Sequence, residues 1–438
     1  MTDLAITARR RQSLLDKLGD GLLILPTGQE LLRNSDVHHD FRPGSDFEYL
    51  TGFPEPDAVL VAWREGRGRH RSVLFVRPRD KAQEIWNGRR LGVSGAIRRH
   101  GVDEAYSIAE LWKKVETLLD GHERVFHTLG RDGRFDGSLM EVLRKRAHDR
   151  RRSNPPAHPV FEDPTPAIGQ LRLIKSREEI EIMERSAEIS VAGHLRAMCV
   201  ARPGMSELEV QAELEAEFRR GGSRRNGYPS IVASGPNAGI LHYTDNDRRM
   251  RRGDLLLVDA GAEMLGYTAD ITRTFPVDGT FTPAQAAIYR VVLAAEKAGI
   301  RSVKPGSSWN SPHTTCLRVI TRGLVKLGVL RGSVPDLVKD GACRKWFMHG
   351  TSHWLGRDVH DVGSYEDEKG RPTRFRPGMV LTVEPGLYFD ARDMSVPKEF
   401  RGIGIRIEDD VLVTRSGHRV LTAAAPKELR DIEAACRG

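Results

Sequence analysis

Short hydrophobic runs alternate with helix-like patterns over the first third of the chain. The runs GLLILP (21–26), AVLVAW (58–63) and SVLFV (72–76) have the length and composition of buried strands. Apolar residues repeat with helical spacing over 108–119, and residues 1–20 mix charged and apolar positions as an amphipathic helix does. These patterns predict an α/β unit.

A proline-rich segment follows this unit. Ser153–Pro166 reads SNPPAHPVFEDPTP. Proline lacks a backbone donor, interrupts helices and is disfavoured in central strands. We therefore predict a linker here, with a first domain over 1–165 and a second over 166–438.

The second part contains longer helices that begin at capping motifs. In each motif a Ser or Thr precedes a Glu or Gln by three positions, so that the two side chains can satisfy each other's backbone donors. The motifs predict helices through 180–191, 208–218 and 286–300, and strand-like segments lie at 231–233, 379–384 and 403–414. Long helices and hairpins without a βαβ rhythm favour an α+β domain. The capping pairs are Ser176 with Glu179, Ser206 with Glu209, and Thr282 with Gln285.

The stretch Leu255–Phe275 carries two aspartates on apolar segments. A leucine-rich run ends on Asp259, a turn containing glycines follows, and a threonine-rich alternating run contains Asp270. The pattern predicts one hairpin. A carboxylate at the end of a buried strand needs a partner or a cation. Either aspartate alone could cap a turn or pair with an arginine such as Arg273, so a metal site requires further ligands.

Candidates for those ligands occur later in the chain. Glu384 ends the run MVLTVE, and in GIGIRIEDD the strand period places Glu408 and Arg406 on the face opposite three isoleucines. The segment MHGTSHWLGRDVHD adds His349, His353 and His360. Carboxylates with one imidazole suit Mn, Co, Fe or Zn. Two such cations about 3.5 Å apart would share bridging carboxylates and activate water for hydrolysis.

Composition and charge exclude other classes of protein. The 438 residues are 39% hydrophobic and 29% charged, which predicts a globular protein of two or three domains. Apolar runs of about 18 residues and a signal-peptide pattern are missing, which favours a cytoplasmic protein without a membrane partner. The net charge of +8 includes the run Arg144–Arg152, but it lacks interleaved aromatics and is interpreted as solvated surface rather than a nucleic-acid site. Four widely spaced cysteines indicate neither disulfides nor a thiolate zinc site.

Together these motifs resemble a known enzyme family. VDAG, YTADITRTFPV, HGTSHWLGRDVHDVG, TVEPGLY and GIGIRIEDD, in this order, are similar to the two-metal peptidases of the pita-bread fold, and most similar to the Xaa-Pro aminopeptidases (aminopeptidase P). SDFEYLTGF, WNGRRLG and VASGPNAGILHYTDN extend the similarity over nearly the whole chain. The resemblance implies a pita-bread catalytic domain of the α+β class, preceded by a smaller creatinase-like α/β domain.

The resemblance also implies roles for individual residues. Two divalent ions, most commonly Mn²⁺, with Co²⁺, Zn²⁺ or Fe²⁺ as alternatives, would hydrolyse the bond between an N-terminal residue and a following proline through a bridging hydroxide. Glu384 would pass a proton to the leaving nitrogen, and His360 or His242 would stabilise the oxyanion. Substrate contacts would come from His349, Arg406, Trp86 and Tyr243. The implied metal ligands are Asp259 on one ion, Asp270 and Glu408 bridging both, and His353 and Glu384 completing the other.

Several alternatives share part of this pattern. Xaa-Pro dipeptidase (prolidase) has the same ligands and two-domain plan, whereas creatinase lacks the ligands and methionine aminopeptidase lacks the long first domain. A metal-free scaffold and a nucleic-acid-binding protein are further alternatives. Arg357 departs from the family, which more often has an aliphatic residue there, and so bears on substrate preference. By the same resemblance we expect a homodimer or homotetramer that acts on peptides with proline at the second position.

Overall fold

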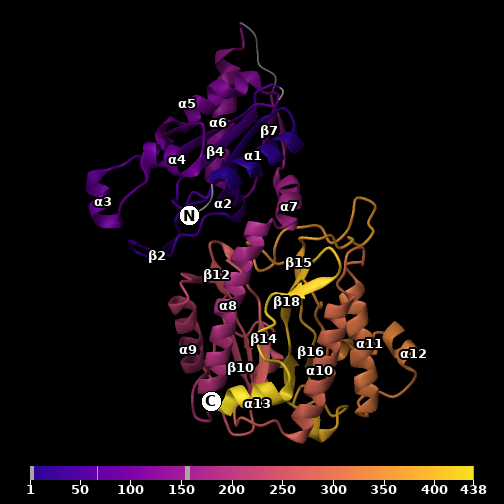
Figure 1. The fold of residues 1–438 in the computed structure, drawn as a ribbon. Helices are drawn as coiled ribbons and strands as arrows, with labels where there is room; N and C mark the ends of the chain where they lie inside the picture. Colours follow the sequence, from indigo (N-terminus) through magenta and orange to yellow (C-terminus); the bar gives the residue numbers. More distant parts are fainter. Residues whose placement is uncertain (1–3, 67, 153–157, 438) are drawn as a thin grey trace. The chain divides into compact units, whose positions relative to one another are not determined.

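The structure is a computed structural model that describes residues 4–66, 68–152 and 158–437. It contains two compact units, Met1–Leu171 and Arg172–Gly438 (Figure 1). In the described part of the chain, no helix has both the length and the apolar composition needed to cross a membrane.

The first unit is built on a six-stranded mixed sheet with strand order β6-β5-β4-β1-β7-β8. The three predicted strands are confirmed as β1, β4 and β5, which pair antiparallel, and the remaining neighbours pair in parallel. The strands span Leu22–Pro26 (β1), Val59–Arg64 (β4), His70–Val76 (β5), Glu104–Ser107 (β6), Arg124–Phe126 (β7) and Val160–Glu162 (β8).

Helices cover both faces of this sheet because alternate strand residues are apolar on both sides. In β1, Leu23 and Leu25 pack with α1, α2 and α4, whereas Leu22 and Ile24 pack with α5 and α6. The predicted helix over 108–119 is α5 preceded by a 3₁₀ turn. The helices are α1 (Leu4–Leu18), α2 (Ser45–Thr51), α4 (Gly92–His100), α5 (Leu111–Leu118) and α6 (Gly133–Asp149).

The segment predicted as a linker belongs partly to the first sheet. Its residues 153–157 lie outside the described residues, but Val160–Glu162 forms β8, and α7 (Thr165–Leu173) begins at its end. β8 pairs with β7 alone, and an edge strand tolerates nearby prolines because one side of its backbone needs no partner.

The second unit contains the long helices α8 (Arg177–Val200), α9 (Glu207–Arg220) and α10 (Pro283–Ser302), and the three predicted capping boxes are all formed. In the described residues, three three-stranded antiparallel sheets lie among the helices, with orders β10-β11-β14, β13-β12-β9 and β15-β18-β19 (Figure 1). β16 pairs with β17. The other helices are α11 (Ser311–Lys326), α12 (Val334–Lys339) and α13 (Leu429–Arg437); the strands are β9 (Arg225–Asn226), β10 (Ile231–Ser234), β11 (Leu255–Asp259), β12 (Ala262–Met264), β13 (Tyr267–Thr268), β14 (Thr272–Pro276), β15 (Val380–Val383), β16 (Gly386–Tyr388), β17 (Gly404–Arg406), β18 (Asp409–Val413) and β19 (His418–Val420).

The predicted hairpin over 255–275 is more elaborate than expected. β11 and β14 do pair antiparallel, but the chain between them forms the separate hairpin β12–β13, and Asp270 precedes β14 instead of lying within it. Likewise, the expected strand 403–414 is divided into β17 and β18, with Glu408 between them. Both carboxylates therefore lie outside the regular strands, although Glu408 forms an isolated bridge with Thr272.

The structure also places the arginine run and the cysteines. The arginine run lies in the last turns of α6 and just beyond, where Arg144 pairs with Glu141 and Arg150 with Asp120, while Arg146 is buried. All four cysteines are free thiols, as expected from their spacing.

Candidate active site

A cavity of about 580 Å³ in the second unit gathers the five predicted metal ligands. Asp259 is the last residue of β11, and Glu384 directly follows β15. Asp270 lies two residues before β14, Glu408 directly precedes β18, and His353 lies on the loop before β15. The cavity is also lined by His242, His349, His360 and Arg406.

Close backbone packing brings the two aspartates together. Ala260 donates a backbone hydrogen bond to Ile271, with 3.1 Å between N and O. A Cβ on Gly261 would lie 1.8 Å from the carbonyl oxygen of Ala269, so only glycine permits this approach. Asp259 and Asp270 consequently enter one cavity from adjacent strand ends.

Tyr228 links the two aspartates. Its hydroxyl oxygen lies 2.7 Å from Oδ1 of Asp259 and 2.5 Å from Oδ1 of Asp270. The hydroxyl carries one hydrogen, which the two carboxyl groups share. Burial and the neighbouring charge of Asp259 raise the pKa of Asp270.

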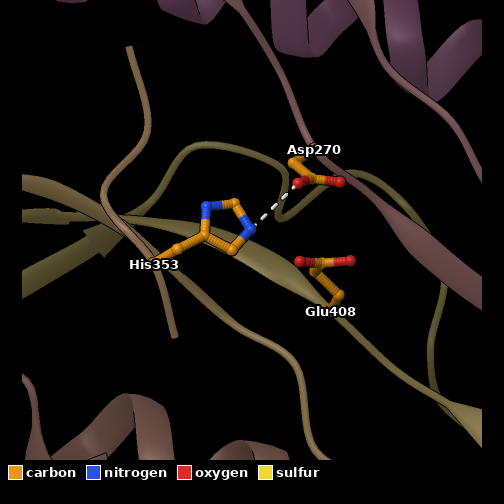
Figure 2. A group of neighbouring side chains, drawn as sticks. All are labelled: Asp270, His353 and Glu408. Atoms are coloured by element: carbon orange, nitrogen blue, oxygen red, sulfur yellow. Dashed lines mark ion pairs between the residues drawn. The ribbon is translucent and has the colours of Figure 1, made fainter. Parts of the chain in front are cut away.

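His353 faces Asp270 (Figure 2). Its Nδ1 lies 3.1 Å from the carbonyl oxygen of Trp354, so Nδ1–H donates there and Nε2 points to the cavity. Nε2 is 3.3 Å from Oδ2 of Asp270 and 3.6 Å from Oε1 of Glu384. Burial alone would lower the pKa of His353, but the hydrogen bond to Asp270 and the charge of Glu384 raise it to about 9.

The two glutamates are buried beside the same group. Thr272 donates its hydroxyl to Oε2 of Glu408 at 2.6 Å. Burial and the nearby charge of Asp270 raise the pKa of Glu408 well above its usual value. Burial, offset in part by the positive charges of His353 and Arg406, raises the pKa of Glu384 to about 7.

These residues suit divalent cations. Asp270, His353 and Glu408 each offer one ligand atom within 4.8 Å of the others, and their side chains converge in Figure 2. Burial and mutual repulsion raise the pKa of Asp270 and Glu408, and bound cations would compensate the negative charges that cause this shift. Oxygen ligands with one imidazole match the preferences of Mn, Co, Fe and Zn.

Metal binding by the metal-free protein is expected to strengthen as pH rises. His353 carries a proton on Nε2 below its pKa of about 9, and that proton must leave before the atom can donate to a metal. Affinity should therefore rise by up to about tenfold per pH unit for this proton and level off above about pH 9. Titration calorimetry with Mn²⁺ over this range measures the effect, and a dissociation constant independent of pH would contradict it.

Arg406 organises one wall of the cavity. Its Nη2 lies 2.5 Å from Oδ2 of Asp259, and its Nη1 donates to the hydroxyl of Tyr388 at 3.0 Å. The Tyr388 hydroxyl lies 2.9 Å from Nε2 of His349, whose Nδ1 lies 2.6 Å from the carbonyl oxygen of Gly350. The chain of donors requires a neutral His349 with its proton on Nδ1. Burial and the charge of Arg406 lower its pKa to about 4, in agreement.

His242 and His360 line the more exposed part of the cavity. The His360 ring packs edge-on against His353, with 4.5 Å between ring centroids. Burial, with the positive charge of His353, lowers the pKa of His360. Its imidazole is thus neutral and able to donate one hydrogen bond to a substrate oxygen.

Three residues singled out in the sequence lie elsewhere. Tyr243 lies outside the described lining of the cavity, and its hydroxyl donates to Oε2 of the buried Glu207 at 2.7 Å. Trp86 lies on α3 (Lys81–Asn87) in the first unit and is 83% exposed. Arg357 is buried, with its guanidinium stacked 4.8 Å from the ring centre of Tyr267, so its charge does not face substrate.

The sequence did not reveal Tyr228, Thr272 or Tyr388 as site residues. Each acts through one hydroxyl that contacts a charged residue distant in sequence. Thr272 could have been found, because it follows Asp270 by two positions in the same alternating run. The other two lack any spacing relation to their partners.

Family comparisons agree with this geometry. Residues 181–415 match the family model for metallopeptidase family M24, and residues 7–126 match that for the aminopeptidase P N-terminal domain. The Xaa-Pro aminopeptidase of Escherichia coli K12 is 46% identical over 97% of this chain and 96% of its own length. Human Xaa-Pro aminopeptidase 3 is 32% identical over 99% of this chain and 85% of its own length.

Solved structures show the same fold. The aminopeptidase PepP of Pseudomonas aeruginosa superposes with a TM-score of 0.96 at 44% identity, covering 99% of this chain and 98% of that chain. Zinc-substituted E. coli aminopeptidase P in complex with product gives a TM-score of 0.95 at 44% identity, over 99% and 98% of the two chains. The chain therefore belongs to metallopeptidase family M24, with a pita-bread catalytic domain preceded by an aminopeptidase P N-terminal domain.

Proposed function

We propose that this chain is an Xaa-Pro aminopeptidase, which hydrolyses the bond between an N-terminal residue and a following proline. The observation that carries the proposal is the buried convergence of Asp270, His353 and Glu408 in a cavity whose other wall is the neutral His349 bonded to Tyr388. Full-length similarity to enzymes of that name supports the same assignment.

The metal complement is part of the proposal. Two divalent ions, most commonly Mn²⁺, would be held by Asp259, Asp270, His353, Glu384 and Glu408, with Asp270 and Glu408 shared between them. Bound there, they supply an activated water and polarise the substrate carbonyl. His353 would need to release its Nε2 proton and Arg406 to yield one Asp259 oxygen, since these groups now occupy the ligand atoms.

The residues of the chain would carry the proton and orient the peptide. Glu384 lies 3.6 Å from His353 and 3.7 Å from His349, which places its carboxyl between both sides of the cavity and suits it to pass a proton to the leaving proline nitrogen. His360 or His242 would donate to the carbonyl oxygen as charge develops. A proline amide has no N–H, so recognition depends on the shape of the cavity wall that includes His349, whose ring is held by Tyr388.

Peptide length separates this activity from that of a dipeptidase. A dipeptidase must bind the free carboxylate after proline, whereas the nearest cation, Arg406, is already bonded to Asp259 and Tyr388. We therefore expect kcat/KM for an extended X-Pro-Y peptide to equal or exceed that for the X-Pro dipeptide sharing its first two residues. Manganese-loaded protein is assayed on both, with chelator-treated protein as control. A clear preference for the dipeptide would move the chain to the prolidases.

Assembly is a further element of the proposal. Ile85 and Trp86 are 81% and 83% exposed on α3, a helix whose described residues are all half-buried or exposed. Apolar surface of this kind is commonly covered in oligomers. We expect a homodimer or homotetramer in which Trp86 borders a neighbouring active site, so that Trp86→Ala raises KM. A monomer by light scattering, with KM unchanged in the variant, would contradict this.

Location and partners complete the proposal. Four free thiols are typical of a reducing compartment, which supports a cytoplasmic protein. The partners we propose are peptides with proline at the second position, with no nucleic acid and no membrane among them.

A further inference from the structure

The loop that carries His360 is held from behind by a buried ion cluster. Asp361, the next residue, has a side chain that is 1% exposed. It receives Nη2 of Arg172 on Oδ1 at 2.6 Å and Nζ of Lys175 on Oδ2 at 3.0 Å. Arg172 lies in the last turn of α7 and Lys175 just before α8, both remote in sequence from the loop, so the contact is a tertiary anchor rather than a local turn.

The same cluster fixes the start of the loop. Nη2 of Arg172 also donates to Oδ2 of Asp358 at 2.7 Å, and the backbone N of Asp358 lies 3.4 Å from Oδ1 of Asp361. The residues between these carboxylates, Val359 and His360, line the cavity. Val359 and His360 therefore lie between two aspartates that Arg172 holds in place.

Packing leaves the anchored turn little freedom. A Cβ on Gly356 would lie 2.2 Å from Oδ2 of Asp361 and 3.0 Å from Cε of Lys175. The backbone N of Asp361 donates to Trp354 at 2.9 Å, and Thr268 donates to the Gly356 carbonyl at 2.9 Å. Lys175 is tied in turn, because its backbone N donates to Gly378 at 2.8 Å. Movement of either cation would be transmitted to the turn.

Charge keeps the cluster intact. Burial alone would raise the pKa of Asp361, but Lys175 and Arg172 outweigh it and lower the pKa, so the carboxylate stays ionised. Removal of one cation would leave a buried charge with one partner fewer, and the loop would shift to solvate it.

We propose that Arg172 and Lys175 are positioning residues that set the place of the His360 imidazole through Asp361. The inference rests on the proposed function, in which His360 donates to the substrate carbonyl. A misplacement near 1 Å can cost up to about 100-fold in rate. The hydrogen bonds of the two cations to Asp358 and Asp361 act on this loop, so their effect should appear in kcat rather than in KM.

The test combines kinetics with the state of the imidazole. Lys175→Met removes the charge at similar length, Lys175→Arg retains it, and Asp361→Asn keeps the shape of the anchor without its charge. We expect Lys175→Met and Asp361→Asn to lower kcat by about 10- to 100-fold with KM nearly unchanged, and Lys175→Arg to restore most of the loss. In a His360→Ala background, Lys175→Met should change kcat less than about twofold. The effects of two substitutions do not add when one residue acts only through the other.

A matched control is the ion pair of Arg248 and Asp254, which lies 2.6 Å apart in the same unit and outside the described cavity lining. Asp254→Asn should leave kcat unchanged, and melting temperatures identify any variant that fails to fold. An equal loss of kcat from Lys175→Met in both backgrounds would overturn the proposal.

A spectroscopic measurement tests the positioning of His360 without relying on the proposed peptidase activity. Ring ¹⁵N resonances of labelled histidine, assigned with His360→Ala, should shift for His360 in Lys175→Met and Asp361→Asn but not for His242. An unshifted His360 resonance overturns positioning even if activity falls. If His360→Ala retains full kcat, the catalytic role of His360 is wrong, and the resonances alone decide whether the cations position it.

Discussion

Asp270→Ala is expected to abolish both metal content and peptidase activity. Asp270 faces His353 at 3.3 Å and shares the Tyr228 hydroxyl with Asp259, so its carboxyl lies at the centre of the cluster. Removing a residue that only hydrogen-bonds to a metal ligand lowers metal affinity by about 10- to 100-fold. Removing a carboxylate that would bind both ions should therefore lower the affinity for each ion by more than that. Elemental analysis after dialysis, beside kcat/KM, measures the effect.

His353→Ala provides the comparison, because its single Nε2 can serve only one ion. This variant should retain part of the metal that Asp270→Ala loses. Two tightly bound metals and full turnover in Asp270→Ala would show that the ligand assignment is wrong.

Arg273→Met is expected to destabilise the second unit by about 3–5 kcal/mol, the range found when one partner of a buried ion pair is removed. The guanidinium is fully buried and donates to Oδ1 of Asp409 at 2.8 Å. It also donates to the carbonyls of Thr272, Glu408, Ala425 and Pro426. Methionine fills similar space but leaves four carbonyls and a carboxylate without this donor. Calorimetry should show a melting temperature lower by on the order of 10 °C.

Arg196→Met is the matched control for this change. Arg196 pairs with Glu213 at 2.8 Å, but the two side chains are 41% and 39% exposed, so water replaces the lost contact. Its melting temperature should remain close to that of the parent protein. An equal decrease in melting temperature in the two variants would mean that burial of the Arg273 network adds nothing to the stability of the protein.

Hydrophobic periodicity predicted the elements that position the site. The run ending at Asp259, the strand before Glu384 and the shared face of Arg406 and Glu408 all follow from local burial patterns, and the structure has them. The capping boxes likewise depend on neighbours three residues apart. Features that depend on residues a few positions apart can therefore be predicted from a single sequence.

Contacts between distant segments could not be read in the same way. The Arg406–Tyr388–His349 chain depends on the register of β16 with β17, and Tyr228 reaches the aspartates from a loop before β10. The motif resemblance implied a substrate contact for Tyr243, and nothing in its local sequence indicated the hydrogen bond from its hydroxyl to Glu207. Arg357 was expected next to the site because of its position in the histidine loop, and its stacking on the ring of Tyr267 could not be predicted from that position.

The contacts of Arg273 with Ala425 and Pro426 have a consequence for synthesis of the chain. The last of the five predicted ligands is Glu408, and Ala425 and Pro426, whose carbonyls help to hold Arg273, leave the ribosome after it. A nascent chain therefore passes through an interval in which the acidic cluster exists without its full support, after the N-terminal unit has had time to fold. Premature termination or proteolytic loss between Glu408 and Pro426 would leave a protein with all five predicted ligands present and Arg273 without two of its acceptors.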